Sequence, residues 1–222
     1  MESANYIQGL VAGFQAGGGW MIPIAIALAV SVAFSIERFI RLYFQYNVDG
    51  ASFMFEIQKY VLASDLDGAI RLCNGTGKAA LPRVIKAGLQ RASRDETQIQ
   101  NAIDAASLEI MPKLERRLPF LALIANISTL LGLLGTISGL IKAFAAIALA
   151  DPAQRQAILS HGISEAMNAT AFGLLTAIFT MISHSILTSK ANHLLEELDE
   201  FGVKLLDLLS ARKYRQPSQQ AE

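Results

Sequence analysis

Three long uncharged stretches limit what this chain can fold into. They run over residues 19–36 (GWMIPIAIALAVSVAFSI), 118–141 (LPFLALIANISTLLGLLGTISGLI) and 166–187, and none contains Asp, Glu, Lys or Arg. A helix needs about 20 apolar residues to cross a hydrocarbon layer about 30 Å thick. One such stretch is compatible with a buried helix of a soluble protein. Three within 222 residues, of which only 17% are charged, predict an all-α integral membrane protein with three transmembrane helices.

The positive charges beside these stretches predict their orientation, because cytoplasmic loops are enriched in Lys and Arg. Arg38 follows the first stretch, Arg117 precedes the second and Lys190 follows the third, whereas residues 1–18 contain neither Lys nor Arg. We therefore expect the N-terminus outside and the C-terminus in the cytoplasm. This orientation places residues 1–18 and 142–165 outside, and it makes residues 37–117 a cytoplasmic helical domain and residues 188–222 a cytoplasmic C-terminal helix and tail.

Apolar residues at helical spacing continue outside the membrane stretches. After the third stretch they are separated by four, three, four and three positions: Leu194, Leu198, Phe201, Leu205 and Leu208. This spacing predicts a coiled-coil-like seam on a helix that reaches about Ala211. Before the second stretch, we expect Pro112 and Pro119 to bend a helix without ending it, because neighbouring helices can donate to the carbonyls that the prolines leave free.

Glu165 precedes the third stretch and has two interpretations. Asp151 and Pro152 predict the start of a short external helix. We expect Gly162 to end it, so that Ser164 caps the next helix and Glu165 lies in its first turn, where a carboxylate gains about 0.3–1 kcal/mol from the helix dipole. In the other interpretation, Glu165 marks the entrance of a pathway across the membrane. The residues alone leave both open.

Small and polar residues recur at spacings of three and four within two of the stretches. They are Gly132, Gly135, Thr136 and Gly139 in the second stretch, and Asn168, Thr170 and Gly173 in the third. Small residues allow close helix approach in lipid, and polar residues at membrane depth normally face the bundle interior or a wet cavity. Tight packing alone is a second explanation, since a Thr hydroxyl often bonds the i−4 carbonyl of its own helix.

The chemistry of these stretches excludes several classes of function. They contain no carboxylate, and a Thr hydroxyl does not titrate near neutral pH. A charge carried through the membrane must therefore come from another polypeptide. The stretches also offer no Ser-His pair, paired carboxylates or metal-ligand set, so we expect no enzyme activity, metal or organic cofactor. A net charge of zero gives no reason to expect nucleic acid as a partner.

Two motifs follow one another in the second half of the chain, LLGLLGTISGLIKAF (130–144) and GISEAMNATAFGLLTAI (162–178). In this order they resemble the MotA/TolQ/ExbB proton channel family, and the ExbB/TolQ branch fits best. The resemblance implies an ion-driven motor in the inner membrane of a Gram-negative-type cell. Five copies would surround two copies of an ExbD- or TolR-like single-span protein whose Asp carries the ion. Thr136 and Thr170 would line the pathway with Glu165 at its entrance, supported by Gly132, Gly135, Gly139, Asn168 and Gly173.

The same resemblance implies H⁺ as the transported ion, with Na⁺ as an alternative. It makes residues 1–18 and 142–165 periplasmic, and it implies a TonB- or TolA-like protein that carries the work towards the outer membrane. Two other functions stay open: the stator of a gliding or adhesion motor built on the same plan, and a non-conducting membrane scaffold that organises partners through its long cytoplasmic helices.

Overall fold

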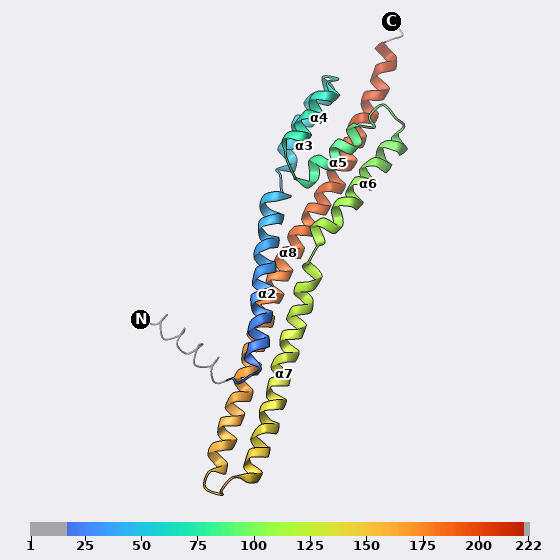
Figure 1. Ribbon diagram of the computed structural model, residues 1–222. Coiled ribbons are helices and arrows are strands. Elements are labelled where there is room, and N and C mark those ends of the chain that lie inside the picture. The colour runs from blue at the N-terminus through green and yellow to red at the C-terminus, as the bar shows by residue number, and fades with distance from the viewer. Residues whose placement is uncertain (1–16, 220–222) are drawn as a thin grey trace, which may run out of the picture. The chain divides into compact units, whose positions relative to one another are not determined.

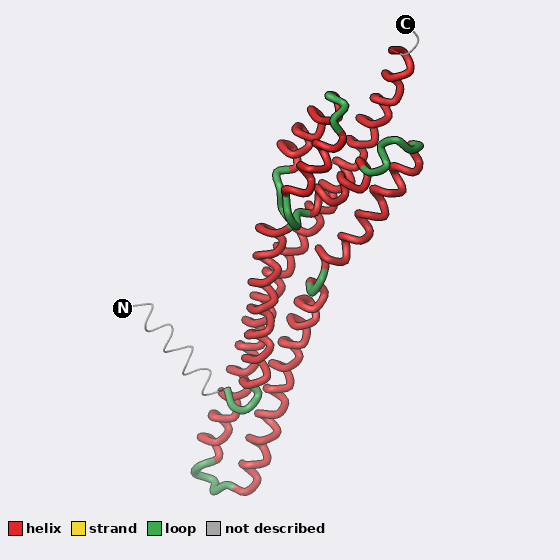
Figure 2. The backbone as a smooth tube through the Cα atoms, turned by 45° about the horizontal axis from the view of Figure 1, so that its top comes forward, coloured by secondary structure: helices red, strands yellow, loops and turns green. Residues whose placement is uncertain are grey.

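The structure is a computed structural model that describes residues 17–219, and the side chains of residues 17–212. Within this part of the chain the regular secondary structure is entirely helical (Figure 2). Three helical stretches are long and apolar enough to cross a membrane: Met21–Leu62, Glu96–Leu149 and Arg155–Arg212 each contain one. The predicted all-helical class and the number of candidate spans are therefore confirmed. The predicted segment 1–18 and the end of the tail lie mostly outside the described residues.

The chain divides into two compact units. The first comprises Met1–Ile36 and Arg117–Ile186, and the second comprises Glu37–Arg116 and Leu187–Glu222. Two helices, α2 (Met21–Ile40) and α8 (Arg155–Gln219), contribute residues to both units. Each unit has its own set of packed helices.

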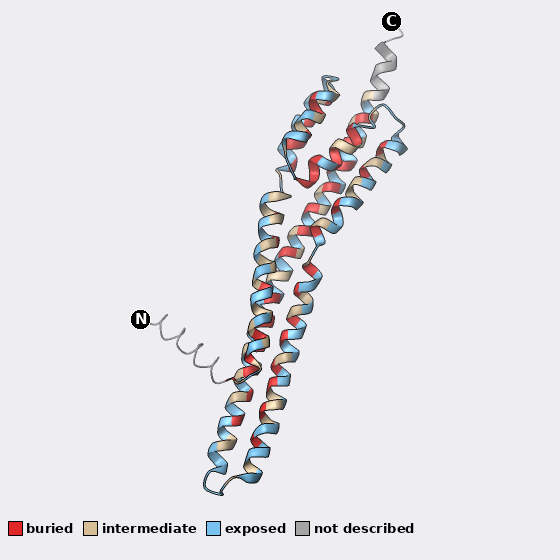
Figure 3. Cartoon of the chain, viewed as in Figure 1, coloured by how far each residue is buried: buried red, intermediate tan, exposed pale blue. Residues whose placement is uncertain are grey.

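The first unit is built around the helix pair α7 (Leu118–Leu149) and α8, which lie side by side (Figure 1). The connection between them comprises only residues 150–154, so most of the predicted loop 142–165 is helical. The buried residues of α7 recur every three or four positions (Figure 3): Leu118, Leu121, Ala125, Ser128, Gly132, Gly135, Gly139 and Ala143. Such a stripe is what one helix presents to a partner along its whole length.

The start of α8 corrects the predicted break at Gly162. The helix begins at Arg155 and continues through Gly162, so Ser164 caps nothing and Glu165 lies well inside the helix. Gly162 is used for packing, because a Cβ at this position would collide with the Ala143 side chain of α7. Contact with α7 offsets the about 1 kcal/mol that glycine costs inside a helix. The interpretation of Glu165 as a first-turn residue is therefore wrong.

The second unit contains the π-helix η1 (Arg41–Gln45), four helices and the C-terminal part of α8. The four helices are α3 (Gly50–Leu62), α4 (Leu66–Gly75), α5 (Ala80–Leu89) and α6 (Glu96–Glu115). Its core includes Ile57, Val84 and Ile85, each 0% exposed. On α8, four members of the predicted coiled-coil-like seam are buried, but Leu209 is buried in place of the fifth, Leu208. The step from Leu205 is therefore four positions and not three, as a straight helix of 3.6 residues per turn favours after the sequence of steps before it.

Pro119 does not simply bend a continuous helix, as the sequence predicted. The helix α6 ends at Glu115, Arg117 has a positive φ of 67°, and α7 begins at Leu118 with Pro119 in its first turn. Proline fits a first turn because its missing N–H has no acceptor there. Pro112, in contrast, lies inside α6 without ending it. The fully buried side chain of Arg38 donates from Nη2 to the carbonyls of Lys113 (3.1 Å) and Leu114, which are among the last carbonyls of α6. These are not the carbonyls that the prolines leave free, which belong to Leu108 and Glu115.

Cys73 in the second unit provides a test of this core. Its side chain is 5% exposed, and burial raises the pKa of the thiol from an ordinary 9.0 to about 11. At pH 8 we expect alkylation of native Cys73 to be about a hundredfold slower than in the unfolded chain, because the thiolate is the nucleophile. The native state should also lose stability as the pH rises from about 9 towards 11, where only the unfolded thiol ionises.

The matched control is a Cys73→Ser chain that carries Ser93→Cys, because Ser93 is exposed in the same unit. Iodoacetamide labelling followed by mass spectrometry measures both rates. Equal labelling of the two thiols in the folded protein would contradict the buried position of Cys73.

Candidate functional site

The small residues of α7 and α8 meet along one seam, which we define by the pairs Gly132–Gly173, Gly135–Ala169, Gly139–Ala166 and Ala143–Gly162. The residue numbers rise along α7 as they fall along α8, so the two helices are antiparallel. The approach is close: a Cβ on Gly173 would lie 2.7 Å from the Ser128 carbonyl oxygen and 2.8 Å from Gly132 Cα. A Cβ on Gly139 would lie 3.1 Å from that of Ala166. Backbone contacts of this kind exclude any larger side chain.

Thr136 and Thr170 come together at the carbonyl group of Gly132. The Thr170 hydroxyl donates across the seam to this carbonyl oxygen at 3.0 Å. In an α-helix the same carbonyl accepts from the backbone N–H four residues later, which is that of Thr136. The Thr136 hydroxyl donates to the carbonyl of Leu133 at 2.7 Å. The structure therefore brings the two predicted threonines to one place.

Helix geometry puts both threonines on the same side of the seam. Thr136 follows the seam residue Gly132 by four positions, and Thr170 follows Ala166 by four, so each is turned about 40° from the seam. Viewed from one end, the residues of two antiparallel helices progress in opposite senses of rotation. Because the helices also face each other, the same offset of four positions on each helix points to the same side of the pair. Both threonines are half-buried, so this side stays accessible.

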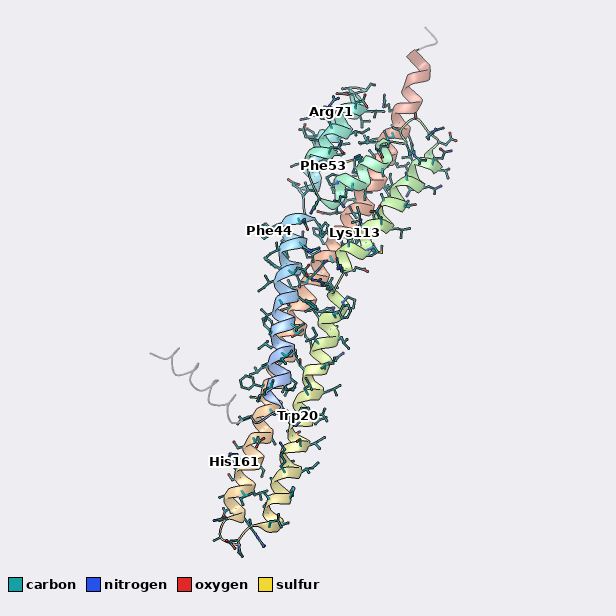
Figure 4. All side chains as sticks on the ribbon, in the orientation of Figure 1. Trp20, Phe44, Phe53, Arg71, Lys113 and His161 are labelled. Atoms are coloured by element: carbon teal, nitrogen blue, oxygen red, sulfur yellow. The ribbon has the colours of Figure 1, made fainter. Side chains whose placement is uncertain are left out.

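The residues just before α2 lie on the opposite side. Trp20 approaches Gly135, where an added Cβ would lie 3.5 Å from the Cβ of the tryptophan. Around α7, Gly135 is rotated about 60° from Gly132, in the sense opposite to Thr136. Trp20 is labelled in Figure 4, beside α7. The helix pair thus has a side that Trp20, just before α2, contacts and a side that carries the threonines.

Glu165 and Asn168 are not brought to the threonines. Glu165 directly precedes the seam residue Ala166 and is turned about 100° towards the side of α2. Its carboxylate packs against Gly18, whose φ is +68°, and a Cβ there would collide with it. Asn168 is half-buried and lies two positions before Thr170, about 200° around α8. The predicted site is therefore split: Thr136, Thr170 and the four glycines share the seam region, and Glu165 stands beside the start of α2.

Other hydroxyls in the same helices bond to their own backbone. Ser128 donates to the Ile124 carbonyl at 2.8 Å, and Thr180 donates to that of Thr176 at 2.8 Å. Both side chains are 0% exposed. The sequence analysis did not include Ala166 and Ala169 as seam residues, although the steps of four, three and four positions from Gly162 through both alanines to Gly173 were a usable signal. It also missed Gly18, for which no sequence signal pointed to Glu165.

Comparison with known proteins gives this arrangement a family. Residues 77–200 match the sequence profile of the MotA/TolQ/ExbB proton channel family. The chain is 36% identical over 100 residues to the Tol-Pal system protein TolQ of Haemophilus influenzae, covering 45% of this chain and 43% of that protein. It is 29% identical over 177 residues to the putative biopolymer transport protein ExbB-like 3 of Synechocystis, covering 78% and 82%. Biopolymer transport protein exbB1 of Vibrio cholerae is 38% identical over 82 residues, covering 37% of this chain and 36% of that protein.

The close contacts along the seam predict which glycine is least tolerant of substitution by a larger residue. Gly173→Ala should destabilise the first unit by about 1–3 kcal/mol, because the added methyl group meets backbone atoms that cannot move aside. Thermal unfolding of the purified protein in detergent measures the loss. Gly19→Ala is the matched control, since a Cβ at Gly19 has no atom within 4 Å. Equal stability of the two variants would contradict the close contact.

Proposed function

The chain belongs to the MotA/TolQ/ExbB proton channel family, and from this membership and the position of its threonines we propose that it is an ion-channel and motor subunit of a bacterial inner membrane. In this proposal it uses the proton-motive force together with a single-span partner of the ExbD or TolR type. The observation that carries the proposal is that the Thr170 hydroxyl bonds the Gly132 carbonyl across the seam while Thr136, one turn after Gly132, is turned to the same side of α7 and α8, away from Trp20.

The surface around the two threonines suits a foreign membrane helix. Leu133, Met167 and Leu174 each follow a seam residue by one position and are therefore turned to the same side as the threonines. They are 53%, 66% and 45% exposed. We call these three residues with Thr136 and Thr170 the threonine face. An apolar helix with a single acidic residue would pack its apolar surface on Leu133, Met167 and Leu174 and place the acid against the two hydroxyls.

The two threonine hydroxyls are arranged to accept a hydrogen bond from an incoming donor. Each threonine already donates its hydrogen to a backbone carbonyl, Thr136 to Leu133 and Thr170 to Gly132, so its oxygen lone pairs remain as acceptors. An incoming carboxyl group can donate to such an oxygen only when it is protonated. The threonine face would therefore favour the neutral form of the partner's acid, which is the form that crosses an apolar environment at the lowest cost.

One chain cannot enclose a pathway with a single face, so we propose a homo-oligomer, with five copies around two partner chains as the resemblance implies. The orientation with the N-terminus outside follows from the distribution of Lys and Arg. The energised process is proposed to be Tol- or TonB-type transport or envelope work, and a gliding or adhesion stator would use the same parts. H⁺ is the proposed ion, although the same acceptor oxygens are also ligands for Na⁺.

A non-conducting scaffold is the competing function, and one observation favours it. Both threonine hydroxyls have hydrogen bonds within the chain, as side chains used only for packing do. The two functions differ in whether they require the threonine hydroxyl oxygens as hydrogen-bond acceptors. A scaffold needs the shape of the threonine face, and an ion pathway also needs its acceptors.

Thr136→Val separates these functions, because it keeps the shape and removes a hydroxyl that bonds only its own helix. We expect normal assembly and at least about a tenfold loss of ion flux, in keeping with the loss of one polar contact to a buried acid. Flux is measured with a pH-sensitive dye in proteoliposomes that contain the complex purified with its partner. Thr136→Ser should restore flux. A dependence on Na⁺ at constant pH would identify sodium as the ion.

Thr180→Val is the matched control, since Thr180 also bonds its own helix, at 2.8 Å, but is not part of the threonine face. Its flux should stay close to that of the unmodified complex. Thr170→Val is less informative, because it also removes the hydrogen bond across the seam. Absence of flux in the unmodified complex would support the scaffold, and unchanged flux in Thr136→Val would exclude the Thr136 hydroxyl from the pathway.

Glu165→Gln tests the proposed entrance. The change keeps the size of the side chain and removes its charge next to Gly18. Because Glu165 is not in a first helical turn, the stability that a helix dipole would give is not at stake. We expect unchanged yield and thermal stability of the complex with a clear reduction in flux at low external ion concentration, where charge at an entrance raises the local ion concentration. A parallel loss of complex and flux would assign Glu165 a structural role.

A further inference from the structure

The end of α2 and the π-helix η1 form an open surface hollow of about 480 Å³, lined by Glu37, Ile40, Arg41, Phe44 and Gln45. All five residues belong to the second unit. Phe44 is 75% exposed and Ile40 is 53% exposed, and Figure 4 labels Phe44 on the outer side of the helix. Leu42 in the same turn is 0% exposed and holds the opposite side of the helix against the unit.

The hollow has a polar row and an apolar row. Glu37, Arg41 and Gln45 are four positions apart along the helix, and Ile40 and Phe44 run beside them with the same spacing. The wider π-turn, closed by the bond from Tyr46 N–H to the Arg41 carbonyl at 2.9 Å, leaves both Phe44 and Gln45 in the lining. π-turns of this kind occur often at functional sites.

Opposite charges lie side by side in the polar row. Arg41 Nε contacts Glu37 Oε1 at 2.9 Å, and their side chains are 38% and 26% exposed. This contact uses one nitrogen of a guanidinium that has five N–H donors, so the terminal nitrogens can donate to a further acceptor. The carboxylate likewise has lone pairs for more than one donor. The hollow therefore presents one cationic and one anionic group in contact with each other, next to exposed apolar side chains.

We propose that this hollow binds the headgroup of a zwitterionic aminophospholipid, of which phosphatidylethanolamine is the type. Arg41 with Gln45 binds the phosphate, Glu37 accepts from the primary ammonium, and the upper part of an acyl chain lies on Ile40 and Phe44. The phosphate of an anionic lipid would bind Arg41, but the rest of its headgroup would lie against the Glu37 carboxylate without an ammonium group to donate to it. A trimethylammonium headgroup has no N–H to donate to the carboxylate.

The aromatic residues of this turn match the headgroup depth. Phe39 stacks on Tyr43 with ring centroids 4.6 Å apart, and it meets Phe44 edge-on at 6.4 Å. Lys190 lies 5.6 Å from the centre of the Tyr43 ring. Aromatic rings with nearby cations are typical of the membrane–water interface. The proposal rests on membrane location and not on ion conduction, and its test measures no flux.

Native mass spectrometry of the full complex in mild detergent tests the proposal, with equal amounts of phosphatidylethanolamine, phosphatidylcholine and phosphatidylglycerol added. We expect the unmodified complex to retain phosphatidylethanolamine several-fold over the other two. Arg41→Gln should reduce its retention about tenfold, because a charge-assisted hydrogen bond to phosphate is lost. Glu37→Gln should abolish the preference for phosphatidylethanolamine over phosphatidylcholine.

Lys59→Gln is the matched control, because Lys59 belongs to another exposed ion pair of the same unit, with Glu56 at 2.6 Å. Exposed pairs contribute about 0–1 kcal/mol to folding, so all variants should assemble, and the same spectra report the mass of each complex. Equal retention of phosphatidylethanolamine by the unmodified and Arg41→Gln complexes would overturn the proposal. So would preferential retention of phosphatidylglycerol or phosphatidylcholine by the unmodified complex.

Discussion

The close approach of α7 and α8 is the constraint on which the first unit depends. Lipid tails are as apolar as leucine, so two membrane helices gain little from hiding apolar surface and must gain contact between atoms instead. Glycine and alanine along the seam bring the backbones close enough for the Thr170 hydroxyl to reach the Gly132 carbonyl on the other helix. The same contact fixes the rotation of each helix, and that rotation decides which side chains share a side.

The sequence was most informative where one periodic signal acted alone. The three apolar stretches predicted the three candidate spans, and glycines at spacings of three and four predicted a close helix pair. It was least informative where one residue has two uses. Gly162 reads as a helix breaker, but in contact with Ala143 it is a packing residue. Pro119 reads as a kink within a helix, but with Arg117 at positive φ it starts a new one.

The candidate site shows the same division. Residue types and spacing were sufficient to place Thr136, Thr170 and the glycines together on facing stripes of two helices, because the seam is formed by neighbours along two regular helices. They were not sufficient to separate Glu165 from the threonines, since its position depends on α8 starting at Arg155 and on contact with Gly18 of a distant segment. Arg38 was read only as an orientation charge. Its use as a donor to the end of α6 depends on where that helix stops.

The chemistry of the threonine face has a consequence for how the proposed motor would work. No group of this chain on that face titrates near neutral pH, so a bound acid cannot be discharged by proton exchange with Thr136 or Thr170. Both hydroxyl hydrogens bond backbone carbonyls. In the proposed motor the two oxygens would therefore act as acceptors and hold the acid in its neutral form. Ionisation then requires the acid to leave the face for a wetter environment. If the partner's helix carries the acid, each proton released is tied to a displacement of that helix against α7 and α8, which makes ion passage and mechanical movement one step.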